Sequence, residues 1–156
     1  MHPRAAELIE KLELKPHPEG GFYREIFRSS EIVTPADQRG ERPALTTIYF
    51  LLTDDMFNRW HRVRSDEVWH LYEGGPLEVM ELDAERRELT THDVAPVHVV
   101  PAGRWQAARS LGPYALVGCT VGPGFDFADF ELLDETISVD PALIVQANDA
   151  ARIRPR

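Results

Sequence analysis

The stretch NRWHRVRSDEVWHLYEGGPLEV, residues Asn58–Val79, decides how the rest of the chain is interpreted. It holds two of the six histidines, an acidic pair and a Gly-Gly turn. Aromatic and β-branched residues alternate in it with polar ones, which is typical of a half-buried strand. Successive side chains of a strand point to opposite faces, so Glu67 and Trp69 share one face and His70 lies on the other. We predict a strand whose His70 points away from Glu67.

Similar short runs lie on both sides of this stretch, each rich in β-branched or aromatic residues and bounded by Gly, Pro, Asp or Asn. They are GGFYREIFRS, ALTTIYFLL, LEVMEL, ELTTHDV, VHVVP, RWQAARSL, YALVGCTV and FELL. This succession predicts an all-β protein. Many short strands at short spacing indicate a sandwich or a barrel in which antiparallel sheets cover each other's apolar faces. Composition leaves both alternatives open.

Two short helices are expected outside the β region. Apolar residues at helical spacing predict an N-terminal helix over about 4–13. The apolar residues after Pro141 predict a C-terminal helix over about 141–151. The chain of 156 residues has the size of one ordinary domain. We therefore expect a single domain over 1–156, with the β region over about 20–134.

Charge and composition exclude several classes of partner. A formal charge of −9 argues against nucleic acid, because phosphate binding needs a clustered positive field. No apolar run approaches the roughly 18 residues of a membrane span, and the first residues lack the apolar core of a signal peptide. We expect no membrane partner and a cytoplasmic protein. The single cysteine, Cys119, lies in the apolar run YALVGCTV and is expected to be buried and inert.

Two spaced patterns resemble the two motifs of the cupin superfamily. The first motif, H-x-H-x(3,4)-E-x(6)-G, matches at His61 and Glu67, and the second, P-x-G-x(2)-H, matches at Pro101 and Gly103. The segments HPEGGFYREIFRS, TTIYFLL, HRVRSDEVWHLYEG and VPAGRWQAA are similar to those of the cupin family named domain of unknown function 985 (DUF985), cupin group 5. The likeness covers residues 12 to about 134. It implies a double-stranded β-helix, the RmlC-like jelly roll, and a homodimer that pairs through outer sheets.

The residues at the motif positions depart from the cupin metal set in two places. Val63 stands at the position of the second histidine of the first motif, and Gln106 at that of the histidine of the second motif. The set His61, Glu67 and Gln106 offers a divalent ion one imidazole, one carboxylate and a weak amide oxygen in place of three imidazoles and a carboxylate. We therefore expect no cofactor; a weakly bound divalent metal on these three residues is the alternative.

Without a metal, His61 and Glu67 are an acid/base pair inside a half-apolar barrel. We expect Glu67 to orient His61 and to raise its pKa, while burial lowers that pKa. The first hypothesis is a non-redox epimerase, isomerase or lyase that uses His61 as the base on an anionic or sugar-like metabolite. The resemblance includes cupin epimerases that use a histidine base without metal. The alternatives are a non-catalytic metabolite-binding or sensing module and a metal-dependent cupin oxygenase.

Five residues are candidates for binding the small-molecule substrate: Tyr23, Arg24, Arg59, Trp105 and Gln106. The two guanidinium groups suit recognition of a carboxylate or phosphate. The two aromatic rings suit stacking on a flat ligand. We expect Trp105 at the barrel mouth, because it lies between a Pro-Ala-Gly turn and Gln106.

Overall fold

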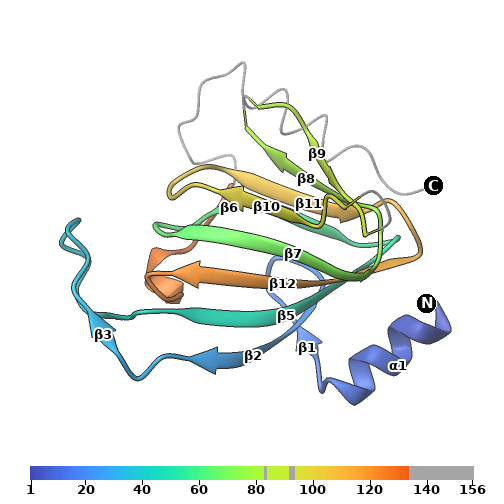
Figure 1. Cartoon of the computed structure of the whole chain (residues 1–156), viewed down its shortest axis with the longest axis horizontal. Coiled ribbons are helices and arrows are strands. Elements are labelled where there is room, and N and C mark those ends of the chain that lie inside the picture. The colour runs from blue at the N-terminus through green and yellow to red at the C-terminus, as the bar shows by residue number, and fades with distance from the viewer. Residues whose placement is uncertain (83, 92–93, 134–156) are drawn as a thin grey trace.

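The computed structural model of the protein describes residues 1–82, 84–91 and 94–133. Most of these residues form two antiparallel sheets that pack face to face (Figure 1). The larger sheet has the strand order β1 (Lys15–Pro16), β2 (Phe22–Arg28), β5 (Thr46–Thr53), β12 (Tyr114–Gly122), β7 (Asp66–Gly74) and β10 (Val97–Val100). The smaller sheet has the order β13 (Glu131–Leu132), β6 (Phe57–Arg62), β11 (Gln106–Ser110), β8 (Leu77–Glu81) and β9 (Arg87–Leu89).

The chain crosses between the sheets at almost every connection from β5 to β13. Strands that follow one another in sequence, such as β5, β6, β7 and β8, therefore alternate between the two sheets. This path makes a double-sheet jelly roll, in which each sheet hides the apolar face of the other. The predicted double-stranded β-helix is confirmed.

The remaining elements lie outside the two sheets. They are α1 (Pro3–Lys11), the 3-10 turn η1 (Phe127–Asp129) and a two-stranded arm of β3 (Ile32–Val33) and β4 (Arg42–Pro43). The expected N-terminal helix is present as α1, which Pro3 begins in its preferred first position. The predicted helix over 141–151 lies outside the described residues. No helix in the described part of the chain is long and apolar enough to span a membrane.

Burial alternates along β7 as the sequence pattern predicts. Glu67 and Trp69 are buried, and Trp69 packs edge-on against Phe50 of β5 with ring centroids 6.1 Å apart. His70 and Tyr72 lie on the other face with their rings stacked at 6.4 Å. The prediction that His70 points away from Glu67 is confirmed, so this histidine is a residue of the outer face.

Two glycines with similar backbone conformations allow a matched test of packing before β2. Gly21 has φ 87°, and a Cβ added there would lie 2.8 Å from Cζ of Phe50 and 2.9 Å from the carbonyl oxygen of Leu51. Gly103 has φ 79°, and an added Cβ would meet nothing within 4 Å. In both positions alanine adopts the left-handed conformation at a cost of about 1–2 kcal/mol.

Only Gly21→Ala also forces side chains and backbone apart, which costs a further ~1–3 kcal/mol. We expect urea denaturation to show a loss of unfolding free energy of about 2–5 kcal/mol for Gly21→Ala and about 1–2 kcal/mol for Gly103→Ala. Equal losses in the two variants would contradict the packing described here.

Candidate active site

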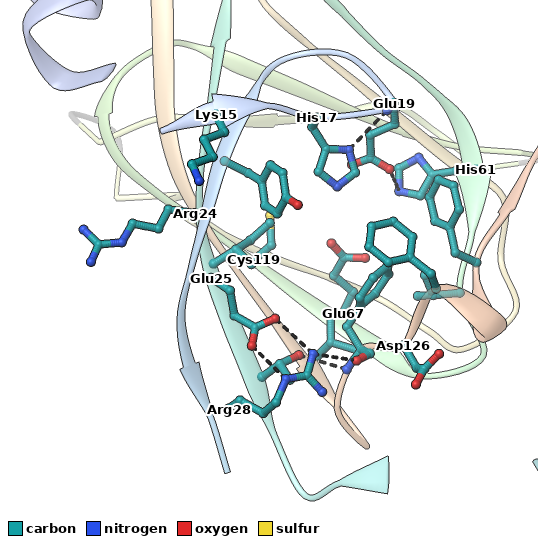
Figure 2. Close-up of a pocket in the computed structure, with 18 of the residues that line it drawn as sticks. Lys15, His17, Glu19, Arg24, Glu25, Arg28, His61, Glu67, Cys119 and Asp126 are labelled. Carbon is teal, nitrogen blue, oxygen red and sulfur yellow. Dashed lines mark hydrogen bonds and ion pairs between the residues drawn. The ribbon is translucent and has the colours of Figure 1, made fainter. Parts of the chain in front are cut away.

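A cavity of about 800 Å³ opens between the two sheets (Figure 2). Its buried end carries titratable side chains from the segment before β2 and from β6 and β7, namely His17, Glu19, His61 and Glu67. One side is aromatic and consists of Tyr23, Phe125, Phe127 and Phe130. The exposed rim carries charges of both signs on Glu13, Lys15, Arg24, Glu25, Arg28 and Asp126. The cavity therefore has a polar floor, an aromatic wall and a charged mouth.

The turn from His17 to Gly21 places two of the floor residues. Its ends are joined by a hydrogen bond from the His17 N–H to the Gly21 carbonyl, 2.9 Å long. Arg59 of β6 fixes the turn from outside: its backbone N–H donates to the Glu19 carbonyl at 2.8 Å and its guanidinium donates to the Pro18 carbonyl at 2.7 Å. The turn is thus tied to β6, and the Glu19 side chain is buried in the cavity.

A β-bulge in β6 turns His61 into the same cavity. Gln106 of β11 pairs with His61 and Ala108 pairs with Asn58, so two residues of β6 lie opposite one residue of β11. Gln106 and Ala108 share a face because they are two residues apart, and their partners therefore share it too. Both partners are buried, His61 at 2% exposure and Asn58 at 0%.

The Glu19 carboxyl group lies between the two imidazole rings. Its Oε2 is 3.4 Å from Nε2 of His61, and its Oε1 is 3.7 Å from Nδ1 of His17. His61 is held from behind by a 2.7 Å contact between its Nδ1 and the Arg59 carbonyl oxygen. The Arg59 carbonyl therefore orients His61, whereas Glu67 acts on it through its charge.

Burial shifts the pKa of every titratable group on the floor. It raises the pKa of Glu19 to about 8, and the Asn58 amide and the charge of Arg59 oppose this shift only in part. Burial and the neighbouring His61 lower the pKa of His17 to about 4. Burial also lowers the pKa of His61, against the opposing effects of Glu67 and the Arg59 carbonyl. Near neutral pH the two imidazoles are therefore unprotonated and Glu19 carries a proton.

The fourth floor residue, Glu67, is held by a buried chain of hydrogen bonds. The side-chain amide of Gln106 donates to Oε2 of Glu67 at 2.8 Å, and its oxygen accepts from the Trp69 indole N–H at 2.9 Å. The thiol of Cys119, which is buried as predicted, lies on the adjacent strand β12 and also lines the cavity. Burial raises the pKa of Glu67.

The same hydrogen bonds show whether His61, Glu67 and Gln106 could bind a metal ion as the cupin residues do. The amide oxygen of Gln106 already accepts a hydrogen bond from the Trp69 indole. Val63, which stands at the position of the second histidine of the first cupin motif, lines the cavity with an apolar side chain. Within residues 1–82, 84–91 and 94–133, no three His, Cys, Asp or Glu side chains are arranged to bind one metal ion. His61, Glu67 and Gln106 therefore do not fit a site of three histidines and a glutamate.

Only two of the five expected substrate-binding residues line the cavity. Tyr23 belongs to its wall and Arg24 to its rim, where the Arg24 side chain points outward (Figure 2) and pairs with Glu13 at 3.0 Å. Arg59 is exposed and supports the turn before β2. Gln106 lies behind Glu67 and is fully buried, so it positions that carboxyl group and does not meet a ligand.

Trp105 lies away from the cavity, which corrects its expected place at the mouth. It packs with Trp60, Met80 and Leu82 in a separate apolar cluster, and the Arg62 guanidinium covers its ring at 4.6 Å. The reason is the alternation of adjacent residues: Gln106 faces the interior, so the residue before it faces the other side of the smaller sheet.

The sequence pattern did not identify His17, Glu19 or the aromatic wall as site residues. Glu19, Gly20 and Gly21 form a turn in the structure, and an added Cβ on Gly20 would lie 2.5 Å from the Phe57 carbonyl oxygen. The two adjacent glycines, Gly20 and Gly21, were the one signal in the sequence for this close packing. The run VGPGFDFADF connects β12 to β13, and its phenylalanines line the cavity.

The raised pKa of Glu19 predicts how stability depends on pH. The ordinary pKa of 4.5 applies to the unfolded chain and a value of about 8 to the folded protein. The folded state therefore retains a proton that the unfolded state has lost, and the resulting stability, complete below about pH 4.5, is lost as pH rises through about 8.

Glu19→Gln replaces the carboxyl group with an amide that does not titrate, so the variant does not lose this stability as pH rises. We expect urea denaturation at about pH 9 to show the variant more stable than the wild type by up to about 5 kcal/mol, with a much smaller difference at about pH 5. A difference that is the same at both pH values would show that Glu19 does not titrate between them.

Comparisons with known proteins agree with this architecture. The family model described as "Cupin superfamily (DUF985)" matches residues 6–133. A hypothetical protein from Leishmania major is 30% identical over 96% of this chain and 94% of its own, with a TM-score of 0.77. A protein from Shewanella oneidensis is 30% identical over 97% of this chain and 98% of its own, with a TM-score of 0.76.

More distant structures share the fold. KdgF from Halomonas sp. is 17% identical over 74% of this chain and 89% of its own, with a TM-score of 0.56. No protein among the curated sequences matches the chain. The family match covers most of the chain, including the turn before β2, the cavity floor and the aromatic wall. The chain therefore belongs to the cupin superfamily, in the family DUF985.

Proposed function

We propose that the cavity is the active site of a non-redox isomerase, epimerase or lyase in which His61 removes a proton from a small anionic or sugar-like metabolite. The observation that carries the proposal is the state of His61, which is buried, oriented by a backbone carbonyl and unprotonated near neutral pH. A general base is most effective when it is unprotonated at the working pH and held in one orientation.

The neighbours of His61 support this role. Its Nε2 is 3.4 Å from the Glu19 carboxyl group, longer than the about 2.7–3.2 Å of an N–H···O hydrogen bond, so the Nε2 lone pair is available to a substrate. The charge of Glu67 raises the pKa of His61 and stabilises the imidazolium that proton removal creates. The neutral Glu19 carboxyl group is a proton donor in the same cavity.

The rim and wall support an anionic or sugar-like ligand. Arg24 and Arg28 are paired with Glu13 and Glu25, at 3.0 and 2.8 Å. Among the described residues no carboxylate pairs with Lys15, which leaves its ammonium group for a ligand anion at the mouth. The aromatic wall of the cavity suits the apolar face of a sugar ring.

Proton exchange tests the proposal whatever the product of the reaction is. The wild-type protein is incubated in D₂O with individual aldoses, ketoses, aldonic acids and uronic acids, and proton NMR follows the loss of carbon-bound protons. We expect one group of related compounds to exchange a single C–H at a rate proportional to protein concentration. Binding without exchange, seen by saturation-transfer NMR, would identify a non-catalytic binding module and contradict the assignment of His61 as a catalytic base.

We also propose that the protein is a homodimer that pairs through the outer face of the larger sheet. The edge strand β10 leaves Val97 and Val99 each 49% exposed, beside Tyr72 of β7 at 52%. An exposed apolar edge of this kind favours association with a second sheet. Sedimentation equilibrium is expected to give twice the chain mass of 17.7 kDa. A concentration-independent monomer would rule the dimer out.

A further inference from the structure

The two imidazoles of the cavity floor are held in opposite tautomers. The Arg59 carbonyl oxygen can only accept, so Nδ1 of His61, 2.7 Å away, carries the proton and Nε2 carries the lone pair. At His17 the roles are reversed, because the backbone N–H of Glu19 donates to Nδ1 at 3.1 Å. In a neutral imidazole the single proton of His17 is then on Nε2.

This arrangement gives the cavity one acceptor and one donor on neighbouring uncharged rings. Figure 2 shows the Nε2 end of His17 directed into the cavity, below its contact with Glu19. Within the described residues no hydrogen-bond partner occupies this Nε2. The His17 side chain is 6% exposed. Its ring packs against the rings of Tyr23 and Phe50, with ring centroids 4.4 and 5.8 Å away. The ring is therefore rigidly placed and largely shielded from water.

We propose that the N–H of His17 Nε2 binds the carbonyl oxygen of the substrate while His61 removes the proton from the adjacent carbon, so that the substrate is a carbonyl compound with an enolisable C–H. This inference rests on the proposed function and names the substrate class and the second residue that touches it. A neutral imidazole is a suitable donor, because it stabilises an oxyanion without giving up its own proton.

The step balances with the groups in the cavity. The substrate C–H bond breaks, its proton forms an N–H bond at Nε2 of His61, and the electron pair becomes the C=C bond as the carbonyl π electrons move to oxygen. The resulting enolate oxygen accepts the hydrogen bond from His17. In an α-hydroxy carbonyl compound, the hydroxyl proton then moves to the enolate oxygen and His61 returns its proton to the former carbonyl carbon, which completes an isomerisation. No external oxidant, reductant or co-reactant is consumed.

Two substitutions of His17 separate its functions. Asparagine places an acceptor where Nδ1 was and keeps the hydrogen bond from Glu19, but removes the donor at Nε2. Glutamine places an amide donor near Nε2 and loses that internal hydrogen bond. We expect His17→Asn to lower kcat for C–H exchange by about 10²–10³-fold with little change in KM, as for loss of one oxyanion donor, and His17→Gln to recover at least about tenfold of this loss.

Nitrogen-15 NMR of the ligand-free protein tests the tautomer independently of any substrate. We expect His17 neutral with its proton on Nε2. A proton on Nδ1 would overturn the inference, as would exchange by His17→Asn within about threefold of the wild type. Either result leaves His61 as the base, so the proposed function survives it.

No exchange by the wild type with any aldose, ketose, aldonic acid or uronic acid would overturn both proposals. Circular dichroism confirms that each variant is folded.

Discussion

His61→Asn is expected to lower the rate of C–H exchange by about 10²–10⁴-fold, the usual contribution of a general base. Asparagine can still donate to the Arg59 carbonyl at the position of Nδ1, and so preserves the hydrogen bond within β6 that orients this side chain. It has no basic group at the position of Nε2. The loss should therefore appear in kcat for the exchanging compound, followed by proton NMR in D₂O, with the fold retained.

Arg64→Gln is the matched control for this variant. Arg64 lies three residues further along, is about half exposed and pairs with Asp37 at 3.3 Å, away from the cavity. Exchange by Arg64→Gln should equal that of the wild type. Exchange by folded His61→Asn at more than about a tenth of the wild-type rate would mean that another group, with Glu19 the nearest, removes the proton.

Phe50→Ala is expected to reduce the unfolding free energy by about 3–5 kcal/mol, as for truncation of other buried phenylalanines. Phe50 is 1% exposed and contacts the rings of both Trp69 and His17. It therefore belongs to the core and also supports the cavity floor. Because the space left by the ring adjoins His17, exchange should fall as well, through poorer placement of that imidazole.

Phe27→Ala, on the adjacent strand β2, is the control with which the loss of unfolding free energy in Phe50→Ala is compared. Phe27 is 51% exposed, so the same truncation should cost less than about 1 kcal/mol in urea denaturation. A similar loss for the two variants would mean that Phe50 does not make the core contacts described for it.

The sequence was sufficient for the parts of the fold that depend on local alternation. The pattern of β7 predicted that Glu67 and Trp69 point inward and His70 outward. The succession of short strands predicted an all-β protein, and the resemblance to the cupins implied the jelly roll. The motif spacing selected His61 and Glu67, which both line the cavity. The directions of these side chains follow from the side-chain period of two in a strand.

The rest of the site depends on contacts that no local pattern encodes. His17 and Glu19 reach the cavity because Arg59, some forty residues later, hydrogen-bonds their turn to β6. His61 shares a face with Asn58 only because of the bulge in β6, which breaks the period of two.

One error was avoidable from the sequence. Trp105 and Gln106 are adjacent, so both could not face the interior of one strand, and Gln106 was already placed there by its motif. The correct assignment puts Trp105 in the apolar cluster on the other side of the smaller sheet.

The charge and tautomer of His61 are the central claim, and nitrogen-15 NMR of the imidazole nitrogens measures them in the ligand-free protein. The structure predicts a neutral ring near neutral pH, with the proton on Nδ1 and an unprotonated Nε2 facing the cavity. An imidazolium in the same conditions would mean that Glu19 is ionised beside it. That result, or a proton on Nε2 alone, would contradict the assignment of His61 as the base.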